Sequence, residues 1–393
     1  MKYDYLVVGA GFAGAVMAER LASQLDKKVL VIDRRNHLAG NCYDFRDESG
    51  IYVHKYGPHA FHTNSKKVWD YLSKFTTWTS YEHRVLAVID GKKVPIPFNF
   101  NSIEMLFPQK DAQNYINTLK SRYGENIKVP ILKLMQENSK ELKFLAEYVY
   151  NKVFLGYTLK QWGLKPEELH YSVTSRVPIF IGRDNRYFYD TYQAIPTLGY
   201  TKLFENIFKN KNIFVELNTE FRDIESSIKF DKIIYTGPID YFFDYKYGKL
   251  PYRSLHFVFE KLDNEYFQEV AQVNYPNDYD WTRITEFKHF HNSKTLSGRL
   301  TRSYKHLMSQ KNKSTIIAYE YPQYYEIGVN EPYYPIPKSE NEELYNKYFN
   351  EAKKLENTVL FIGRLAEYKY YNMDEIIGAV LLKFEKMFRK NGF

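Results

Sequence analysis

Three glycines near the start of the chain constrain its fold more than any other feature. Gly9, Gly11 and Gly14 form a GxGxxG motif directly after the apolar run Tyr5–Val8. Between a strand and a helix, the first glycine permits a tight turn, the second lets the backbone approach a pyrophosphate, and the third lets the helix pack closely on the strand. The motif therefore predicts a nucleotide-binding unit in which a helix N-terminus faces phosphates.

The residues after this motif complete the unit. Residues 14–25 place apolar side chains at four-residue intervals, which predicts an amphipathic helix. A second apolar run, 29–32, ends at Asp33, whose carboxylate is placed to accept hydrogen bonds from ribose hydroxyls. The acid, the basic residues and the small-residue turn between Asp33 and Asn41 resemble the FAD signature of amine-oxidase-like flavoproteins.

Composition narrows the classes of ligand and compartment. The 393 residues carry 55 basic and 47 acidic side chains, and this mild positive excess leaves phosphorylated small molecules and nucleic acid both open as ligands. Cys42 is the only cysteine, which excludes an intramolecular disulfide and a cysteine zinc cage, and no metal site is expected. The sequence contains no apolar run of about eighteen residues, so we expect a cytoplasmic protein without a membrane span.

Periodicity along the chain predicts an α/β fold with three kinds of region. Apolar runs at 232–235 and 359–362 return to the nucleotide domain as strands, and 374–388 closes it with a helix. Residues 101–171 show helical periodicity without a convincing strand, whereas 81–98 and three later stretches indicate an antiparallel sheet. The predicted domains are a discontinuous Rossmann-like FAD-binding domain (1–78, 199–245, 335–393), a helical substrate and lid domain (101–178), and an antiparallel sheet domain (79–100, 179–198, 246–334).

A series of motifs identifies one family among the flavoproteins. The motifs are HKYGPHAFHT at 54–63, GYTLKQWG at 156–163, IYTGPIDYFFDY at 234–245, YRSL from Tyr252, EPYYP from Glu331 and FIGRLAEYKYYNMDE from Phe361. They are similar, in the same order, to the motifs of bacterial UDP-galactopyranose mutases. The resemblance spans nearly the whole chain, and the later motifs are highly specific.

The resemblance implies a reaction in which FAD acts as a nucleophile without net redox change. In this family only the reduced flavin is active: N5 attacks the anomeric carbon, UDP leaves, the sugar recloses through another hydroxyl, and UDP returns. The implied function is the reversible ring contraction of UDP-galactopyranose to UDP-galactofuranose through this covalent adduct, which supplies galactofuranose for surface glycans. UDP-N-acetylgalactosamine stays open as a second substrate, and a homodimer is implied.

The same resemblance assigns the groups that bind the substrate. Arg176 and Arg283 match two arginines on the diphosphate, where forked, charge-assisted hydrogen bonds stabilise the leaving group, so we expect both to be catalytic. Phe154 and Tyr157 match positions that stack on uracil, and Trp162 lies in the lid. The remaining substrate positions are Tyr187, Tyr334, Tyr370 and Asn372.

The cofactor positions combine the glycine motif with residues from later segments. They are Gly9, Gly11, Phe12, Ala13, Gly14, Asp33, Arg34, Gly40, Asn41, His59, Gly363, Arg364 and Met373, with Arg253 as a weaker candidate. Gly156 and Gly163 flank the lid motif, which favours a hinged loop there. His59 and His62 lie in the segment beside the expected flavin, and neither is assigned an acid–base role.

Two positions depart from the family pattern. Ala39 precedes Gly40 where the family often has paired glycines, a change that the turn tolerates if position 39 needs no positive φ. Asn372 stands where an aspartate commonly follows the YKYY run. The amide keeps a hydrogen-bonding side chain there and loses the charge.

Two other functions stay open from the sequence. A flavin amine-oxidase-like oxidoreductase would share the FAD domain and would release hydrogen peroxide from an added substrate. A non-catalytic nucleotide- or RNA-binding protein would account for the positive charge and the 18% aromatic residues. Because basic residues are not concentrated in a stripe, we expect neither nucleic acid nor a membrane as a partner.

Overall fold

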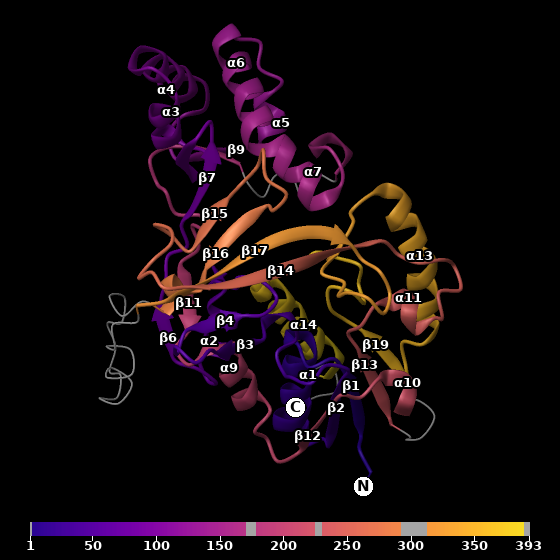
Figure 1. Cartoon of the computed structure of the whole chain (residues 1–393). Coiled ribbons are helices and arrows are strands. Elements are labelled where there is room, and N and C mark those ends of the chain that lie inside the picture. The colour runs from indigo at the N-terminus through magenta and orange to yellow at the C-terminus, as the bar shows by residue number, and fades with distance from the viewer. Residues whose placement is uncertain (1, 170–177, 225–229, 292–312, 389–393) are drawn as a thin grey trace.

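A parallel sheet of five strands forms the base of the molecule (Figure 1). The computed structural model describes residues 2–169, 178–224, 230–291 and 313–388. The strands lie in the order β12 (Ile213–Leu217), β2 (Val29–Asp33), β1 (Tyr5–Val8), β13 (Lys232–Tyr235) and β19 (Val359–Phe361). The expected strands of the nucleotide-binding unit are therefore confirmed, and all of their pairings are parallel.

Two long helices cover one face of this sheet. Helix α1 (Phe12–Leu25) follows the glycine motif and packs against α14 (Met373–Phe388), which comes from the other end of the chain. The stripe that predicted α1 includes Met17 and Leu21, and both side chains are fully buried in the same core cluster as Ile377 of α14. Burial of these apolar faces fixes the helix N-terminus at the carboxyl ends of β1 and β2.

A second, larger sheet crosses the middle of the molecule and is mostly antiparallel (Figure 1). Its longest strands pair over ten residues, from Arg253↔Tyr324 to Leu262↔Thr315. Among the strands that the structure describes in this sheet, β15 pairs with β7 in parallel and the other pairings are antiparallel. Its strands in order are β18 (Tyr334–Pro335), β14 (Tyr252–Leu262), β17 (Thr315–Tyr324), β16 (Arg283–Glu286), β15 (Gln272–Asn274), β7 (Val85–Ile89) and β8 (Lys92–Ile96).

Residues 179–198, which the sequence placed with this sheet, pair elsewhere. Strand β10 (Ile179–Ile181) pairs with β9 (Ile127–Val129), and β11 (Tyr192–Pro196) lies between β5 (Phe61–Thr63) and β6 (Trp78–Ser80). The expectation of no strand within 101–171 is also wrong, because β9 lies there. The side chains of β10 are buried against the helical core, and a three-residue strand carries too little pattern to reveal its partner.

A group of helices stands on the far side of the large sheet from the parallel sheet (Figure 1). It comprises α3 (Phe100–Leu106), α4 (Gln109–Tyr123), α5 (Ile131–Leu134), α6 (Lys140–Val149), the π-helical turn η2 (Tyr150–Leu155) and α7 (Gly156–Trp162). Its core includes Leu142, Leu145 and Val149, the stripe that predicted helices here. In the described part of the chain, no helix has both the length and the apolar composition needed to cross a bilayer.

The remaining described elements include the sixteen-residue helix α13 and several short helices and strands. They are η1 (Gly40–Cys42), β3 (Asp44–Arg46), β4 (Tyr52–His54), α2 (Lys66–Leu72), η3 (Pro166–Glu168), α9 (Gly199–Ile207), α10 (Phe221–Ile224), α11 (Ile239–Phe242), η4 (Phe287–His291) and α13 (Ser339–Lys354).

Candidate active site

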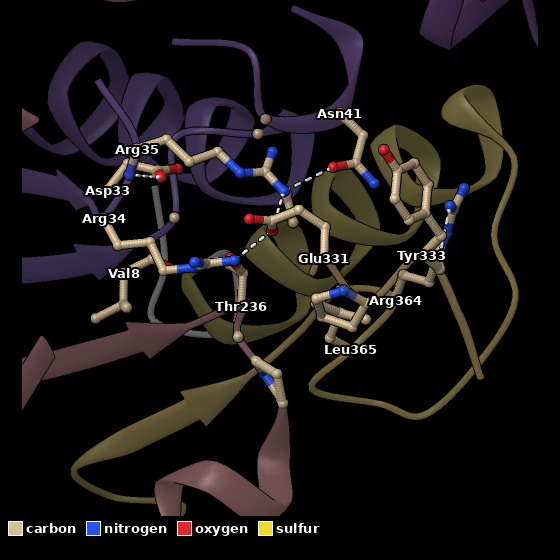
Figure 2. Close-up of a pocket in the computed structure, with 18 of the residues that line it drawn as sticks. Val8, Asp33, Arg34, Arg35, Asn41, Thr236, Glu331, Tyr333, Arg364 and Leu365 are labelled. Atoms are coloured by element: carbon tan, nitrogen blue, oxygen red, sulfur yellow. Dashed lines mark hydrogen bonds and ion pairs between the residues drawn. The ribbon is translucent and has the colours of Figure 1, made fainter. Parts of the chain in front are cut away.

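A cavity of about 450 Å³ opens at the carboxyl ends of the parallel strands. Its walls come from the start of α1, the ends of β2 and β13, the segment 325–333 and the segment 363–373 (Figure 2). The volume is typical of a site for an organic ligand. Of the predicted cofactor residues, those that line the cavity are Gly9, Gly11, Phe12, Ala13, Asp33, Arg34, Gly40, Asn41, His59, Gly363, Arg364 and Met373.

The three glycines of the motif differ in what surrounds them. Gly9 has a φ of +109°, and a Cβ there would lie 2.1 Å from the Thr236 hydroxyl oxygen. A Cβ on Gly14 would lie 1.9 Å from the Gly9 carbonyl oxygen, so this glycine permits helix packing and does not line the cavity. A Cβ on Gly11 would approach only the Cα of Gly40, at 3.8 Å. Backbone N–H groups at the start of α1 therefore face an open cradle that suits a pyrophosphate.

The carboxylate at the end of β2 is held by the backbone. The amide of Ala10 donates to Oδ2 of Asp33 at 2.8 Å, and the amide of Arg35 donates to Oδ1 at 3.0 Å. Each oxygen has remaining acceptor capacity on the cavity side. This geometry fits the ribose-binding acid of a dinucleotide site.

Position 39 needs a positive φ, so the condition under which the turn was expected to tolerate alanine is not met. Ala39 has φ +74°, and Gly40 follows with φ +55°. The two residues turn the chain so that Gly40 packs against Gly11, and the amide of Ala39 donates to the carbonyl of Ala10 at 3.1 Å. The turn accepts alanine only with local backbone strain, because an L-residue is disfavoured in this region.

Arg364 lies at the end of the cavity that adjoins the predicted substrate residues Tyr334 and Tyr370. Its guanidinium donates to the carbonyl of Tyr333 at 3.2 Å (Figure 2) and to that of Tyr371 at 2.6 Å. The same guanidinium lies over the rings of Tyr334 and Tyr370, at 5.4 Å and 5.1 Å. Those two rings stack with 5.4 Å between centroids. One arginine thus joins the cofactor cavity to the predicted substrate residues.

Arg283 occupies the neighbouring part of the large sheet. Its Nε donates to Oε2 of Glu320 at 2.8 Å, and neither Nη group bonds a residue that the structure describes. Burial alone would lower the pKa of Arg283, but Glu320 and the nearby hydroxyls of Tyr157 and Tyr334 outweigh it and raise the pKa well above its ordinary value. The guanidinium is therefore a permanent cation beside the tyrosines.

The lid motif forms a helix, which corrects the expected hinged loop. Residues 156–162 form α7, which continues directly from η2, and only Gly163 has a positive φ, as the C-cap. Gly156 is in a helical conformation, where a Cβ would lie 2.3 Å from the Pro276 carbonyl oxygen. Close packing therefore explains this glycine better than a hinge. Trp162 is 9% exposed, with its ring 5.9 Å from that of Tyr334.

Comparison with known proteins decides the family. A family model described as UDP-galactopyranose mutase matches residues 152–370, and a model described as NAD(P)-binding Rossmann-like domain matches residues 7–75. A Klebsiella pneumoniae protein described as "Probable UDP-galactopyranose mutase" is 35% identical over 96% of this chain and 93% of its own length. The chain belongs to the UDP-galactopyranose mutase family. It is an isomerase of this family.

Two further comparisons bear on substrate and fold. The dTDP-fucopyranose mutase of Escherichia coli is also 35% identical, over 95% of both chains. The crystal structure of a reduced UDP-galactopyranose mutase superposes with a TM-score of 0.71 at 15% identity, covering 99% of this chain and 94% of that one. The family fold, a Rossmann-like domain combined with an antiparallel sheet and helices, is therefore confirmed.

The other residues predicted from the family lie in different settings. Arg176 falls outside the described residues. Phe154 is buried in the core of the helical group, and Tyr187 packs edge-on against His83 with 5.6 Å between ring centroids. Asn372 lines the cofactor cavity, and its backbone amide donates to Glu375 at 2.6 Å.

Two cations that sequence reasoning did not place at the lid hold α7. The ammonium of Lys160 donates to the carbonyls of Tyr275, Tyr279 and Trp281, the last two at 2.9 Å and 3.1 Å. Arg253, the weaker cofactor candidate, donates instead to the carbonyls of Lys160 and Gln161 at 3.0 Å and 2.8 Å. These carbonyls belong to the last turn of α7, where a cation is favourable.

The two histidines of the HKYGPHAFHT motif have different partners. Nδ1 of His59 lies 2.8 Å from the carbonyl oxygen of Gly57, and burial lowers the pKa of His59 to about 4. Nδ1 of His62 lies 3.0 Å from Oδ2 of Asp190, and its ring stacks on Phe188. A neutral His59 at the cavity wall has the role of a packing and hydrogen-bonding group.

Two acidic residues near the site were not singled out from the sequence. Glu320 pairs with Arg283, and Glu331 pairs with both Arg34 and Arg35. Glu331 begins the EPYYP motif, which was its only signal. Glu320 stands in a strand, where an isolated acid normally faces solvent, yet its side chain is 1% exposed.

Proposed function

We propose that this protein binds FAD and interconverts UDP-galactopyranose and UDP-galactofuranose. The position of Arg364 carries the proposal. Arg364 lines the cofactor cavity, which is the first site, and lies over Tyr334 and Tyr370, which belong to the predicted substrate site, the second. A cofactor in the first site would therefore adjoin a sugar nucleotide in the second. The amine-oxidase and non-catalytic alternatives are not favoured, because the chain is a member of an isomerase family.

The residues present suit FAD. The open face at Gly11, the acid Asp33 and the start of α1 would hold the diphosphate and ribose, and Gly363 and Met373 line the far wall. The reduced flavin, when bound, supplies the nucleophile N5 for the anomeric carbon, so the protein needs none of its own. Its own residues bind, orient and enclose the sugar nucleotide.

The arginines would stabilise the negative charge of the leaving UDP. Arg283 is held through Nε, so its two Nη groups can form a fork with the diphosphate, each charge-assisted hydrogen bond contributing ~1.5–3 kcal/mol. We assign Arg176 to the same diphosphate. Oε1 of Glu320 is buried without a partner among the described residues, and we assign it to a substrate hydroxyl. Tyr157 and Trp162 on α7 would cover the bound sugar nucleotide and exclude water from it.

Activity that depends on reduction tests the proposal. Purified protein should show flavin absorbance and should convert UDP-galactofuranose to UDP-galactopyranose only after reduction with dithionite, as read by chromatography. Amine substrates should give no hydrogen peroxide. Reduced, flavin-loaded protein that leaves both sugar nucleotides unchanged would contradict the proposal.

The relatives are named for two different sugar nucleotides, so a second substrate class stays open. A dTDP-fucopyranose mutase has the same percent identity to this chain as the Klebsiella protein. Sequence identity therefore does not decide which nucleobase the substrate carries or which group stands at C6 of its sugar. Rates for UDP-galactofuranose, dTDP-fucofuranose and the furanose form of UDP-N-acetylgalactosamine would rank the candidates, and we expect UDP-galactofuranose to rank first. We further propose a homodimer in the cytoplasm, which light scattering and cell fractionation would test.

A further inference from the structure

The acid Glu331 bridges two arginines at the ribose end of the cavity (Figure 2). Oε2 accepts a hydrogen bond from the guanidinium of Arg34 and another, at 2.6 Å, from that of Arg35. Arg35 also donates to Oδ1 of Asn41 at 2.9 Å and lies 4.5 Å from the ring centroid of Tyr56. The bridge joins the end of β2 to a segment almost three hundred residues later in the chain.

The position of these charges matters for cofactor selection. In Rossmann-like sites, the acid at the end of the second strand binds the ribose 2′-hydroxyl, and an arginine close by accommodates a 2′-phosphate when the ligand has one. Asp33 is such an acid, and Arg34 and Arg35 follow it directly. The sequence alone therefore allows a site for either kind of dinucleotide.

We propose that Glu331 is a specificity-determining residue of the cofactor site, which occupies both arginines and so makes the site reject dinucleotides that carry a 2′-phosphate. The inference rests on the proposed binding of FAD, whose ribose hydroxyls are free. Three carboxylates that line the cavity, those of Asp33, Glu220 and Glu331, offset the two guanidiniums of Arg34 and Arg35. A 2′-phosphate beside Asp33 would therefore meet Arg34 and Arg35 with their charges already paired by Glu331.

Burial strengthens the bridge. The side chain of Arg35 is 14% exposed and that of Glu331 24% exposed, whereas Arg34 is 46% exposed. Burial alone would raise the pKa of Glu331, but the two guanidiniums outweigh it and lower the pKa, so the carboxylate stays ionised at neutral pH. Removing its charge would leave two adjacent guanidiniums, one of them mostly buried, without their shared partner.

The experiment compares two probes that differ only in the phosphate. ADP-ribose and 2′-phospho-ADP-ribose are titrated against flavin-loaded protein, and released FAD is measured by fluorescence after ultrafiltration. In the wild type, 2′-phospho-ADP-ribose should require at least about tenfold more ligand for half release. In Glu331→Gln this ratio should fall by about tenfold or more, because the two arginines become available.

Matched variants separate the bridge from a general change of charge. Glu220 lines the same cavity, so Glu220→Gln removes a carboxylate while leaving the Arg34–Glu331–Arg35 bridge, and should keep the wild-type ratio. Should Glu331→Gln fold poorly, Arg34→Gln at an exposed side chain tests the same idea in the opposite direction. It leaves the site more negative, and the ratio should rise.

Each outcome decides between the inference and the function beneath it. Flavin-loaded Glu331→Gln with the wild-type ratio, Arg34→Gln with an unchanged ratio, or a wild type that prefers the phosphorylated probe would overturn the inference alone. Protein that carries no flavin and gives no calorimetric heat with ADP-ribose would contradict the proposed function, and the inference with it.

Discussion

At the scale of single residues, the turn at position 39 holds strain that a glycine would remove. Ala39 is buried and has φ +74°. The left-handed conformation costs an L-residue ~1–2 kcal/mol, while Ala39→Gly loses ~0.8 kcal/mol of methyl burial and ~0.5–1 kcal/mol of backbone entropy. We therefore expect this variant to be nearly neutral in unfolding free energy.

A helical alanine gives the matched comparison. Ala18 is fully buried in α1, so Ala18→Gly loses a similar methyl and adds ~1 kcal/mol of helix propensity. Urea denaturation should show Ala18→Gly to be at least ~1 kcal/mol more destabilising than Ala39→Gly. Equal losses would mean that position 39 stores no strain.

The second prediction at this scale concerns the fork of Arg283. Lysine keeps the charge but lacks the planar guanidinium, which can bond Glu320 through Nε while its two Nη groups fork onto the diphosphate, so Arg283→Lys should lower kcat at least ~10-fold with the flavin spectrum unchanged. The control is Arg183→Lys, because Arg183 is an exposed residue paired with Glu104. Turnover measured under dithionite checks both variants. Near-wild-type turnover in Arg283→Lys would remove Arg283 from the diphosphate.

At the scale of elements, α7 depends on its attachment to the loop 275–281. Lys160 bonds three carbonyls of that loop, and α7 carries Tyr157 and Trp162 toward the predicted substrate site. Lys160→Met removes these bonds and should weaken UDP binding by at least ~10-fold, since α7 would lose its attachment to the loop 275–281 and keep only that of Arg253. Tryptophan fluorescence during a UDP titration measures the change.

A nearby lysine serves as the control for this prediction. Lys152 lies in η2 and pairs with Asp90 at the surface, at 2.6 Å with 43% of its side chain exposed. Exposed ion pairs contribute little, so Lys152→Met should keep the wild-type affinity. If both variants bound UDP equally well, the attachment of α7 would have no part in binding.

Elements with strong local patterns could be predicted, and those defined by distant contacts could not. The unit β1–α1–β2 was predictable because its glycines, its apolar stripe and Asp33 lie within 29 residues, from Tyr5 to Asp33. The helical form of α7 was not, because Gly156 is there to let a helix approach Pro276, and sequence spacing cannot tell this from a hinge. Glu331 was missed because its two partners are about three hundred residues away.

At the scale of the whole molecule, the large sheet lies between the parallel sheet and the helical group (Figure 1). Composition and periodicity predicted these three kinds of region, and the family resemblance predicted that they belong to one fold. The exact boundaries of the three domains stay a prediction. What periodicity could not show is the pairing of short strands such as β9 and β10, because a three-residue run fits any edge.

Buried histidines at the junction of the layers make stability depend on pH. Burial lowers the pKa of His59 to about 4 and those of His83 and His291 to about 3, and it lowers the pKa of His54 well below its ordinary value. The folded state therefore keeps these rings neutral where the unfolded chain binds protons, below pH ~6.5. Because the unfolded state binds more protons, the unfolding free energy falls as pH falls from ~6.5 toward 4.

A variant at His291 tests the contribution of one of these histidines. Its Nε2 is buried without a hydrogen-bond partner in the described part of the chain, and each histidine of this kind contributes up to ~1.4 kcal/mol per pH unit. His291→Gln should therefore lose ~1 kcal/mol less than the wild type between pH 6 and pH 5, as measured by urea unfolding at both values. His256 is exposed on β14, so His256→Gln should follow the wild type. A wild-type slope in His291→Gln would show that this ring takes up its proton without unfolding, because the fold admits water there.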